Sequence, residues 1–444
     1  MSTQLKIGID AQIMPGTSGG VSQFIASLVR ALGQLPDGSE TYTVIVGSQQ
    51  QMDWIKTYSG PNHRFVLKSL FSNHGGSGSK NGHLNIPALC KRALRSLLPT
   101  ARYYAQKLVN SPMQWPEVPL SDGFYESLGC DVVHIPTQNF VLCALPTIYN
   151  PHDLQHLHYP QFFTPSTIAW RETVYPAGCR LAHTVIANTQ WIKNDIIRHY
   201  GIDADKIQVI PEGPPAPAGR KPPAEFIAAV KRKYQLEQPF GLYPAVTWPH
   251  KNHLRLLEAL AQLRDTRNLM IQLVCTGSRY DTFWPQIQSR VDELKLSSQV
   301  KFLGFVSDDE LSAIYRLSQF LVMPTLFEAS SLPIYEAWLE GVPVICSNAS
   351  ALPEQVKDSA LLFDPHSVEA IANAVAKVAT NNTLRRELEI KGTRRIKDFD
   401  WERTARAYRA VYRRAAGFPL TEEDQWLLKW DWMRTPEVKM EASL

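Results

Sequence analysis

Short apolar runs alternate with longer segments of helical periodicity through most of the chain. In the first half, residues 5–13 form an apolar run that predicts a buried strand, and residues 21–33 carry apolar side chains at helical spacing. The later strands predicted in this half are 41–46, 131–135, 146–149 and 184–187. This alternation is typical of a doubly wound α/β domain with a parallel sheet.

The same alternation resumes in the second half. Strands are predicted at 241–246, 270–276, 300–303, 320–323, 342–346 and 360–363, and helices at 368–380, 384–397 and 401–415. Between the halves, residues 211–223 contain six prolines, which form a stiff connector and predict a domain boundary. We therefore predict a first domain over 1–215, a second over 225–400, and a crossover helix with an apolar tail over 401–444.

The length of the chain agrees with this division. With 444 residues it is too long for one compact core and suits two domains. Two doubly wound domains that face one another leave a cleft at the carboxyl ends of their strands, where such folds bind ligands. The motifs described below follow predicted strands, so we expect the ligand site to lie between the domains.

Composition narrows the class of protein. Hydrophobic residues make up 44% of the chain and charged residues 20%, which is ordinary for a globular protein. The N-terminus lacks the basic and apolar regions of a signal peptide, and no apolar run reaches about 18 residues. The six cysteines are scattered without a CxxC pair. We therefore expect reduced thiols in a cytoplasmic protein.

The positive charge of the chain is unevenly distributed. The net charge is +4, but residues 64–115 contain eight Lys or Arg and no Asp or Glu. Within this basic insertion, residues 89–109 form a basic amphipathic stretch that suits the anionic inner face of a membrane. A helix that packs on the domain and solvates its charges fits equally well. Nucleic acid is not expected as a partner, because no zinc spacing or aromatic–basic interleaving is present.

Two glutamates flank a predicted helix start in the second half. Glu328 and Glu336 lie eight positions apart, and Pro333 between them suits the first turn of a helix. Ser330 or Ser331 could cap that helix through a side-chain oxygen. The free N–H groups there would bind a phosphate, and the carboxylates could hold sugar hydroxyls. The alternative is an ordinary capped helix with surface glutamates.

Residues 327–347 resemble the nucleotide-sugar site of the retaining glycosyltransferases of the GT-B type, specifically glycosyltransferase family 4. The matching residues are Glu328, Glu336, Ala337 and the segment Gly341-Val342-Pro343-Val344. Two loop glycines of the family are replaced by Ala329 and Ser331. The resemblance covers most of residues 5–416 and implies a GT-B fold that transfers a hexose from a nucleotide-diphosphate sugar with retention of configuration.

The glycines after the first predicted strand gain a role from this resemblance. Gly16, Gly19 and Gly20 lack the GxGxxG spacing and the downstream acidic residue of a dinucleotide site, so a nicotinamide enzyme is not favoured. Family members have a glycine pair here that approaches the donor phosphate or the acceptor, which implies this role for Gly19 and Gly20. A plain turn before a helix is the alternative.

Histidines cluster after the strand predicted at 146–149. The resemblance assigns a contact with the donor sugar to His152. His156 and His158 complete a metal-like sequence, HDLQHLH, whose spacing fits no zinc pattern well. We therefore interpret His156 and His158 as structural residues and expect no metal ion.

The remaining donor contacts are implied at strand ends of the second domain. Lys251 would place its ammonium on the donor diphosphate, and His250 stands where the family usually has Arg. Further donor-binding residues implied here are Gly277, Phe305, Val306, Ser330, Ser331, Leu332 and Glu336. A turn glycine is the alternative for Gly277.

The resemblance also implies a mechanism. Glu328 would hold the sugar O3 and O4, Glu336 would hold the ribose, and Glu328, His152 and Lys251 would carry catalysis without a cofactor or metal. GDP-mannose is the first donor expected, with UDP-sugars as the alternative. The acceptor would be a glycan, either free or polyprenol-linked. A nucleotide-sugar epimerase and a catalytically inactive sugar-binding homologue are the competing interpretations.

Overall fold

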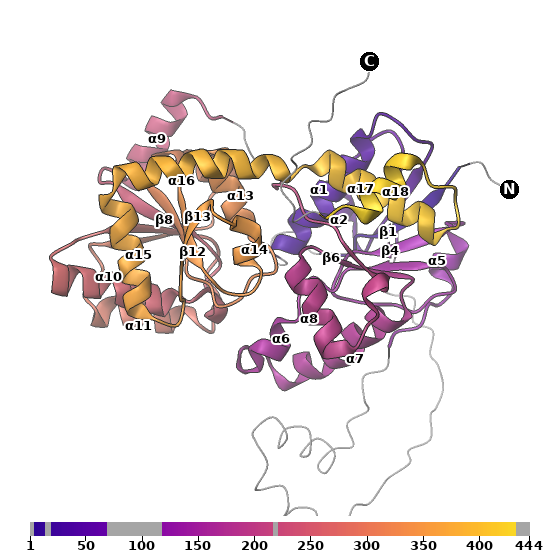
Figure 1. Ribbon diagram of the computed structural model, residues 1–444, viewed down its shortest axis with the longest axis horizontal. Coiled ribbons are helices and arrows are strands. Elements are labelled where there is room, and N and C mark those ends of the chain that lie inside the picture. The colour runs from indigo at the N-terminus through magenta and orange to yellow at the C-terminus, as the bar shows by residue number, and fades with distance from the viewer. Residues whose placement is uncertain (1–3, 14–18, 69–117, 216–220, 432–444) are drawn as a thin grey trace, which may run out of the picture.

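A computed structural model describes residues 4–13, 19–68, 118–215 and 221–431 of the chain. Two lobes lie side by side, each built around a parallel sheet with helices on both faces (Figure 1). The polypeptide passes from one lobe to the other after β7 and returns at its C-terminal end. The fold is GT-B, as the sequence predicted.

The first sheet has seven strands in the order β3-β2-β1-β4-β5-β6-β7. Their bounds are β1 (Lys6–Asp10), β2 (Thr41–Val46), β3 (His63–Leu67), β4 (Val132–Ile135), β5 (Thr147–Tyr149), β6 (Thr184–Ala187) and β7 (Ile207–Val209). In the centre of the sheet, Ile7 of β1 is in register with Tyr42 and Val132 on its two sides. Because helices cover both faces, most residues of the inner strands are buried instead of alternating between buried and exposed.

The helices of this lobe follow the strands in turn. They are α1 (Gly20–Gln34), α2 (Gln49–Lys56), α5 (Phe124–Ser127), α6 (Gln155–His158), α7 (Pro165–Leu181) and α8 (Gln190–Tyr200). The side chain of Thr189 caps α8 by accepting a hydrogen bond from the Ile192 N–H.

The second sheet has six strands in the order β10-β9-β8-β11-β12-β13. Its strands are β8 (Phe240–Pro244), β9 (Gln272–Thr276), β10 (Val300–Gly304), β11 (Phe320–Met323), β12 (Val344–Ser347) and β13 (Ala360–Phe363). Its helices are α9 (Ala224–Tyr234), α10 (His253–Arg267), α11 (Trp284–Glu293), α12 (Asp308–Leu317), α13 (Leu332–Leu339), α14 (Leu352–Val356), α15 (Val368–Thr380) and α16 (Asn382–Arg395). The strands and the helices α15 and α16 agree closely with the sequence prediction.

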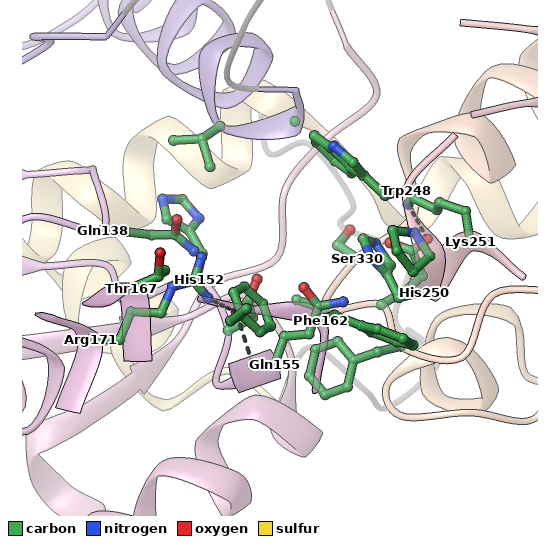
Figure 2. Close-up of a pocket in the computed structure, with 18 of the residues that line it drawn as sticks. Gln138, His152, Gln155, Phe162, Thr167, Arg171, Trp248, His250, Lys251 and Ser330 are labelled. Atoms are coloured by element: carbon green, nitrogen blue, oxygen red, sulfur yellow. Dashed lines mark hydrogen bonds and ion pairs between the residues drawn. The ribbon is translucent and has the colours of Figure 1, made fainter. Parts of the chain in front are cut away.

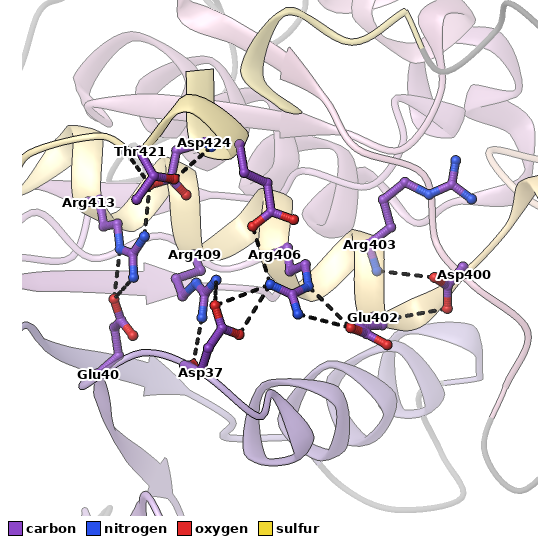
Figure 3. A network of polar contacts seen from close by, with 11 residues as sticks. Asp37, Glu40, Asp400, Glu402, Arg403, Arg406, Arg409, Arg413, Thr421 and Asp424 are labelled. Carbon is purple, nitrogen blue, oxygen red and sulfur yellow. Dashed lines mark hydrogen bonds and ion pairs between the residues drawn. The ribbon is translucent and has the colours of Figure 1, made fainter. Parts of the chain in front are cut away.

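Helix α17 (Trp401–Ala415) returns to the first lobe and packs on α1, as the family resemblance implied. Tyr408 and Tyr412 of α17 are buried in the core of that lobe. On its other side, Arg409 contacts Asp37, and Arg413 bridges Glu40 and Asp424 (Figure 3). Asp424 belongs to α18 (Glu422–Lys429), so one arginine ties three segments together.

Two strands were not anticipated from the sequence. β3 lies at the start of the basic run, and β7 is only three residues long before the proline-rich connector. The rest of the basic run, including the helix expected at 89–109, lies outside the described residues, as do the last residues of the tail. The proposed domain boundaries at 215, 225 and 400 stay a prediction.

Among the described residues, no helix has the length and hydropathy needed to span a bilayer. Five cysteines lie in the described part of the chain, and all five are free thiols: Cys130, Cys143, Cys179, Cys275 and Cys346.

Candidate active site

A cavity of about 410 Å³ lies between the two lobes. Loops that follow the carboxyl ends of strands in both sheets form its walls, because parallel strands end at the same edge. Figure 2 shows His152, Gln138 and Arg171 of the first lobe facing Trp248, His250 and Lys251 of the second. The cavity therefore lies where the sequence predicted a ligand site.

Lys251 and Glu328 form an ion pair on the second-lobe side of this cavity. The Lys251 ammonium donates to Glu328 Oε1 at 2.5 Å, and the two side chains are 15% and 11% exposed. Lys251 ends a 3₁₀ turn after β8, and Glu328 lies on the loop between β11 and α13. The two charged groups that the sequence picked out separately thus meet at one place.

His250 lies next to this pair and is uncharged at neutral pH. Burial, together with the nearby Lys251 and His253, holds the pKa of the His250 imidazole well below its usual value. Its ring stacks on Trp248, with centroids 5.7 Å apart and an angle of 27° between the planes. Where the family usually has an arginine, this chain therefore presents a neutral aromatic surface.

His152 lines the opposite wall in a constrained conformation. Its backbone has a φ of 62°, which is unusual for a residue other than glycine. The Nε2–H donates to the Pro136 carbonyl at 2.8 Å, and burial lowers the pKa of the ring. Because a carbonyl can only accept, the proton is on Nε2, and Nδ1 of the neutral ring is left as an acceptor.

The glycine pair at the start of α1 lies where the lobes meet. Gly20 lines the cavity, whereas Gly19 does not. Gly19 has a φ of +53°, and a Cβ there would lie 3.4 Å from the Trp248 ring of the other lobe. Glycine thus allows the first turn of α1 to approach the second lobe closely.

The start of α13 corrects one sequence expectation. Pro333 does lie in the first turn, but neither Ser330 nor Ser331 caps the helix with its side chain. Instead, Gln355 brackets Ser331: its Oε1 accepts from the Ser331 N–H, and its amide donates to the Ser331 carbonyl, both at 2.9 Å. A side-chain amide from α14 therefore holds both peptide groups of Ser331, and no hydroxyl caps the helix. The buried Ser331 Oγ has no partner among the described residues.

Several predicted donor-binding residues lie outside the cavity. Glu336 accepts a hydrogen bond from Tyr315 Oη at 2.8 Å, and burial raises its pKa to about 7. Phe305 is 79% exposed, whereas the neighbouring Val306 is buried. The predicted residues that do line the cavity are Gly20, His152, His250, Lys251, Glu328, Ser330 and Leu332. Those that do not are Gly19, Gly277, Phe305, Val306, Ser331 and Glu336.

Sequence reasoning missed part of the first-lobe wall. Glu212 follows β7 and receives a hydrogen bond from Asn188 Nδ2 at 3.3 Å, and burial raises the pKa of its carboxyl to about 7. Arg171 of α7 lies 4.6 Å from the centre of the Phe163 ring and 3.5 Å from Asp153. Asp153 adjoins His152 and could have been found there. Arg171 lies mid-helix, where nothing in the sequence marks it.

Direct contacts between the lobes surround this site. The Phe327 ring packs against His158, Tyr159 and Trp191 of the first lobe, at centroid distances of 5.2, 6.4 and 5.5 Å. The Glu354 carboxylate accepts hydrogen bonds from the Gln190 and Trp191 N–H groups at 2.6 and 2.7 Å. A carboxylate of the second lobe thus binds the amino end of α8 in the first.

Two family models match different parts of the chain. One is described as "Glycosyl transferases group 1" and matches residues 228–395, and the other is "Glycosyltransferase Family 4", matching residues 90–214. Their matches fall on the two lobes that enclose the cavity. The chain belongs to the family 4, group 1 glycosyltransferases.

Relatives of this glycosyltransferase include several mannosyltransferases. It is 29% identical over 268 residues to O-antigen chain mannosyltransferase B of Escherichia coli, covering 59% of this chain and 69% of that one. It is 32% identical over 183 residues to the serotype-specific mannosyltransferase WbdA of Escherichia coli, covering 41% and 22%. It is 28% identical over 241 residues to a D-inositol 3-phosphate glycosyltransferase of Corynebacterium glutamicum (strain R), covering 52% and 57%. The chain therefore spans about a fifth of WbdA and little more than half of the inositol phosphate enzyme.

Solved structures agree on the fold. The Anabaena protein HepE in complex with UDP and glucose has a TM-score of 0.65 at 16% identity, covering 92% of this glycosyltransferase and 99% of that chain. A glycosyltransferase of Rickettsia africae has a TM-score of 0.64 at 16% identity, with coverages of 93% and 99%. At these identities the likeness concerns the GT-B architecture.

Proposed function

We propose that this glycosyltransferase transfers mannose from GDP-mannose to a glycan acceptor with retention of configuration. The observation that carries the proposal is the Lys251–Glu328 ion pair in an interlobe cavity, opposite the neutral His152. The mannosyltransferase relatives favour mannose over other hexoses.

The second lobe supplies what departure of a diphosphate needs. Negative charge develops on the leaving group, and a positioned cation stabilises it most where water is excluded. Lys251 and Arg171 are the positively charged residues among the described ones that line the cavity, because His152 and His250 are neutral. Lys251 is the one on the second-lobe side, so we assign it to the diphosphate, together with the Leu332 N–H at the start of α13, because the Ser331 N–H is already bonded to Gln355.

Glu328 and His152 orient the sugar in this proposal. Glu328 accepts from the sugar hydroxyls while its other interaction holds Lys251 in place. His152 presents an unprotonated Nδ1, which can accept a hydrogen bond from a hydroxyl. Transfer then follows a front-side route, in which the leaving phosphate takes the proton of the acceptor. No metal ion is required for these steps, so EDTA should leave the transfer rate unchanged.

The first lobe binds the acceptor in this proposal. Its side of the cavity combines the aromatic rings of Phe162 and Phe163 with the polar groups of Gln138, Thr167 and Arg171, a mixture that suits a carbohydrate. Residues 64–115 contain eight Lys or Arg and no Asp or Glu, which suits the anionic inner face of a membrane. We therefore extend the proposal to a polyprenol-linked acceptor that lies on this surface.

A donor panel tests the proposal. Purified protein is mixed with GDP-mannose, UDP-glucose and UDP-galactose, and the thermal shift, donor hydrolysis and product anomer are measured. Stabilisation and slow hydrolysis with GDP-mannose, and an axial product bond by NMR, are expected. Preference for a UDP-sugar would replace the donor assignment, and binding without any hydrolysis or transfer would indicate a sugar-binding homologue. Interconversion of the donor without an acceptor would indicate an epimerase.

A further inference from the structure

Three side chains outside the cavity converge near the contact between the lobes. His158 ends α6, and Asp195 and His199 lie one turn apart on α8. His158 Nε2 lies 2.9 Å from Asp195 Oδ2, and His199 Nε2 lies 3.3 Å from Asp195 Oδ1. The three ligand atoms all lie within 4.8 Å of one another.

The HDLQHLH sequence is not itself this cluster. His152 faces the cavity, and His156 bonds Glu172 at 2.8 Å. His158 is the member of that sequence that reaches the cluster, and the other two groups come from a helix about 40 residues later. The sequence spacing therefore fits no zinc pattern, although the folded chain brings two imidazoles and a carboxylate together.

We propose that His158, Asp195 and His199 bind a late first-row divalent cation of the Zn²⁺ class. Two imidazole nitrogens and one carboxylate oxygen are the ligands that such ions favour. Ligand atoms at about 2.1 Å from a tetrahedral ion lie about 3.4 Å apart, which is close to the Asp–His separations here. Asp195 is 5% exposed and fixed, whereas the exposed His199 ring can turn toward the ion and leaves a fourth position for water.

The cluster lies next to the contact between the lobes, so a bound ion would affect the second lobe as well as α6 and α8. The His158 ring packs on Phe327 of the second lobe at 5.2 Å, and Trp191 packs on both His158 and Phe327. An ion that fixes the His158 ring would also fix the surface that Phe327 rests on. Metal binding should therefore raise the thermal stability of the protein without supplying a group to the transfer reaction.

Cobalt provides a direct readout, because tetrahedral Co²⁺ has intense visible absorption that hexahydrated Co²⁺ lacks. The full chain, free of any polyhistidine tag, is treated with a chelator, dialysed and titrated with Co²⁺ and then with Zn²⁺. We expect one equivalent to bind with tetrahedral bands, Zn²⁺ to displace it, and the unfolding midpoint to rise by a few degrees.

Matched variants identify the ligands. His199→Gln and Asp195→Asn keep similar side-chain shapes, and each should weaken metal binding by at least about 100-fold. His366→Gln changes an exposed histidine of the second lobe and should bind as the wild type does. Circular dichroism confirms that each variant is folded before titration.

Two outcomes would overturn this inference. One is the absence of tetrahedral Co²⁺ bands in the wild type, and the other is equal affinity in wild type, His199→Gln and Asp195→Asn. Either result would leave His158 as a hydrogen-bonding partner of Asp195 and His199 as a nearby ion-pair partner. Neither bears on the glycosyltransferase proposal, because the readouts are metal affinity and absorption rather than transfer.

Discussion

Lys251 and Glu328 lie 77 positions apart in sequence, yet their side chains form an ion pair. Both side chains are largely shielded from water, so their interaction is stronger than it would be on an open surface. Removing one partner would leave the other as an uncompensated charge beside the cavity. The pair therefore has to be tested from both ends.

We expect Lys251→Ala and Glu328→Gln each to lower kcat by orders of magnitude while the fold is kept. In the proposed function, Lys251→Ala would remove the cation assigned to the leaving diphosphate, and Glu328→Gln would remove the anionic acceptor assigned to the sugar hydroxyls. Steady-state kinetics on the preferred donor, with circular dichroism as the fold control, measure this. Near-normal rates in both variants would refute the site assignment.

Glu212 makes the stability of the first lobe depend on pH. Burial raises its carboxyl pKa from 4.5 to about 7 in the folded protein, so between these values the folded state binds more protons than the unfolded state. Stability contributed by the protonated form is therefore lost as pH rises from about 4.5 through 7. The difference amounts to about 3 kcal/mol, since one pKa unit corresponds to about 1.4 kcal/mol.

Glu212→Gln should remove this dependence, because the amide stays neutral and still accepts from Asn188. Urea unfolding between pH 5 and 8 should show the wild type losing stability relative to the variant as pH rises. Glu336, whose pKa is raised in the same direction, is present in both proteins and cancels in the comparison. Parallel pH profiles for the two proteins would contradict the assignment.

At the level of elements, the sequence predicted most of the strands but missed β3 and β7. The strands 320–323 and 360–363 agree with β11 and β13 because a buried parallel strand is a continuous apolar run. β3 was hidden because its residues, HRFVL, include two polar side chains near the sheet edge. β7 has three residues, too few to form a recognisable pattern.

The residues of the candidate site also fall into those that the sequence could identify and those that it could not. Lys251, Glu328 and His152 could be found from their sequence neighbourhoods, since each follows a strand and lies in a motif. Gln355 and Glu212 could not, because their roles depend on partners brought together by the fold. The serine cap failed for a related reason: local sequence suggested a capping hydroxyl, whereas in the fold no side chain caps the helix and the Gln355 amide holds the peptide groups of Ser331.

Helix α17 offers a test at this scale. Arg413 donates to Glu40 Oε1 at 2.7 Å and to Asp424 Oδ2 at 2.8 Å, and both carboxylates are buried. Arg413→Leu would leave two buried charges unpaired, so we expect the free energy of unfolding to fall by about 3–5 kcal/mol. Urea denaturation measures this loss.

Arg386→Leu, which changes an exposed arginine of α16, serves as the control and should alter stability by less than about 0.5 kcal/mol. If both leucine variants were equally stable, the attachment of α17 to the first lobe would rest on its apolar face alone.

At the scale of the whole molecule, the basic run 64–115 predicts salt-sensitive binding to anionic membranes. Each basic side chain near such a surface contributes about 1 kcal/mol, and salt screens the attraction. Sedimentation with anionic liposomes at low salt should carry the protein down. Neutral liposomes, or anionic ones at high salt, should not. Negligible binding to both kinds of liposome would remove the membrane proposal.

Phe327 and Glu328 are adjacent in the chain, but one packs against the first lobe and the other pairs with Lys251 of the second. Separating the lobes would break the ring contacts of Phe327 with His158 and Trp191 and would shift the peptide that carries Glu328. In the proposed reaction, an opening of the lobes would therefore also disturb the position of Glu328. The packing of Phe327 on the first lobe therefore couples any lobe opening to the geometry of the proposed donor site.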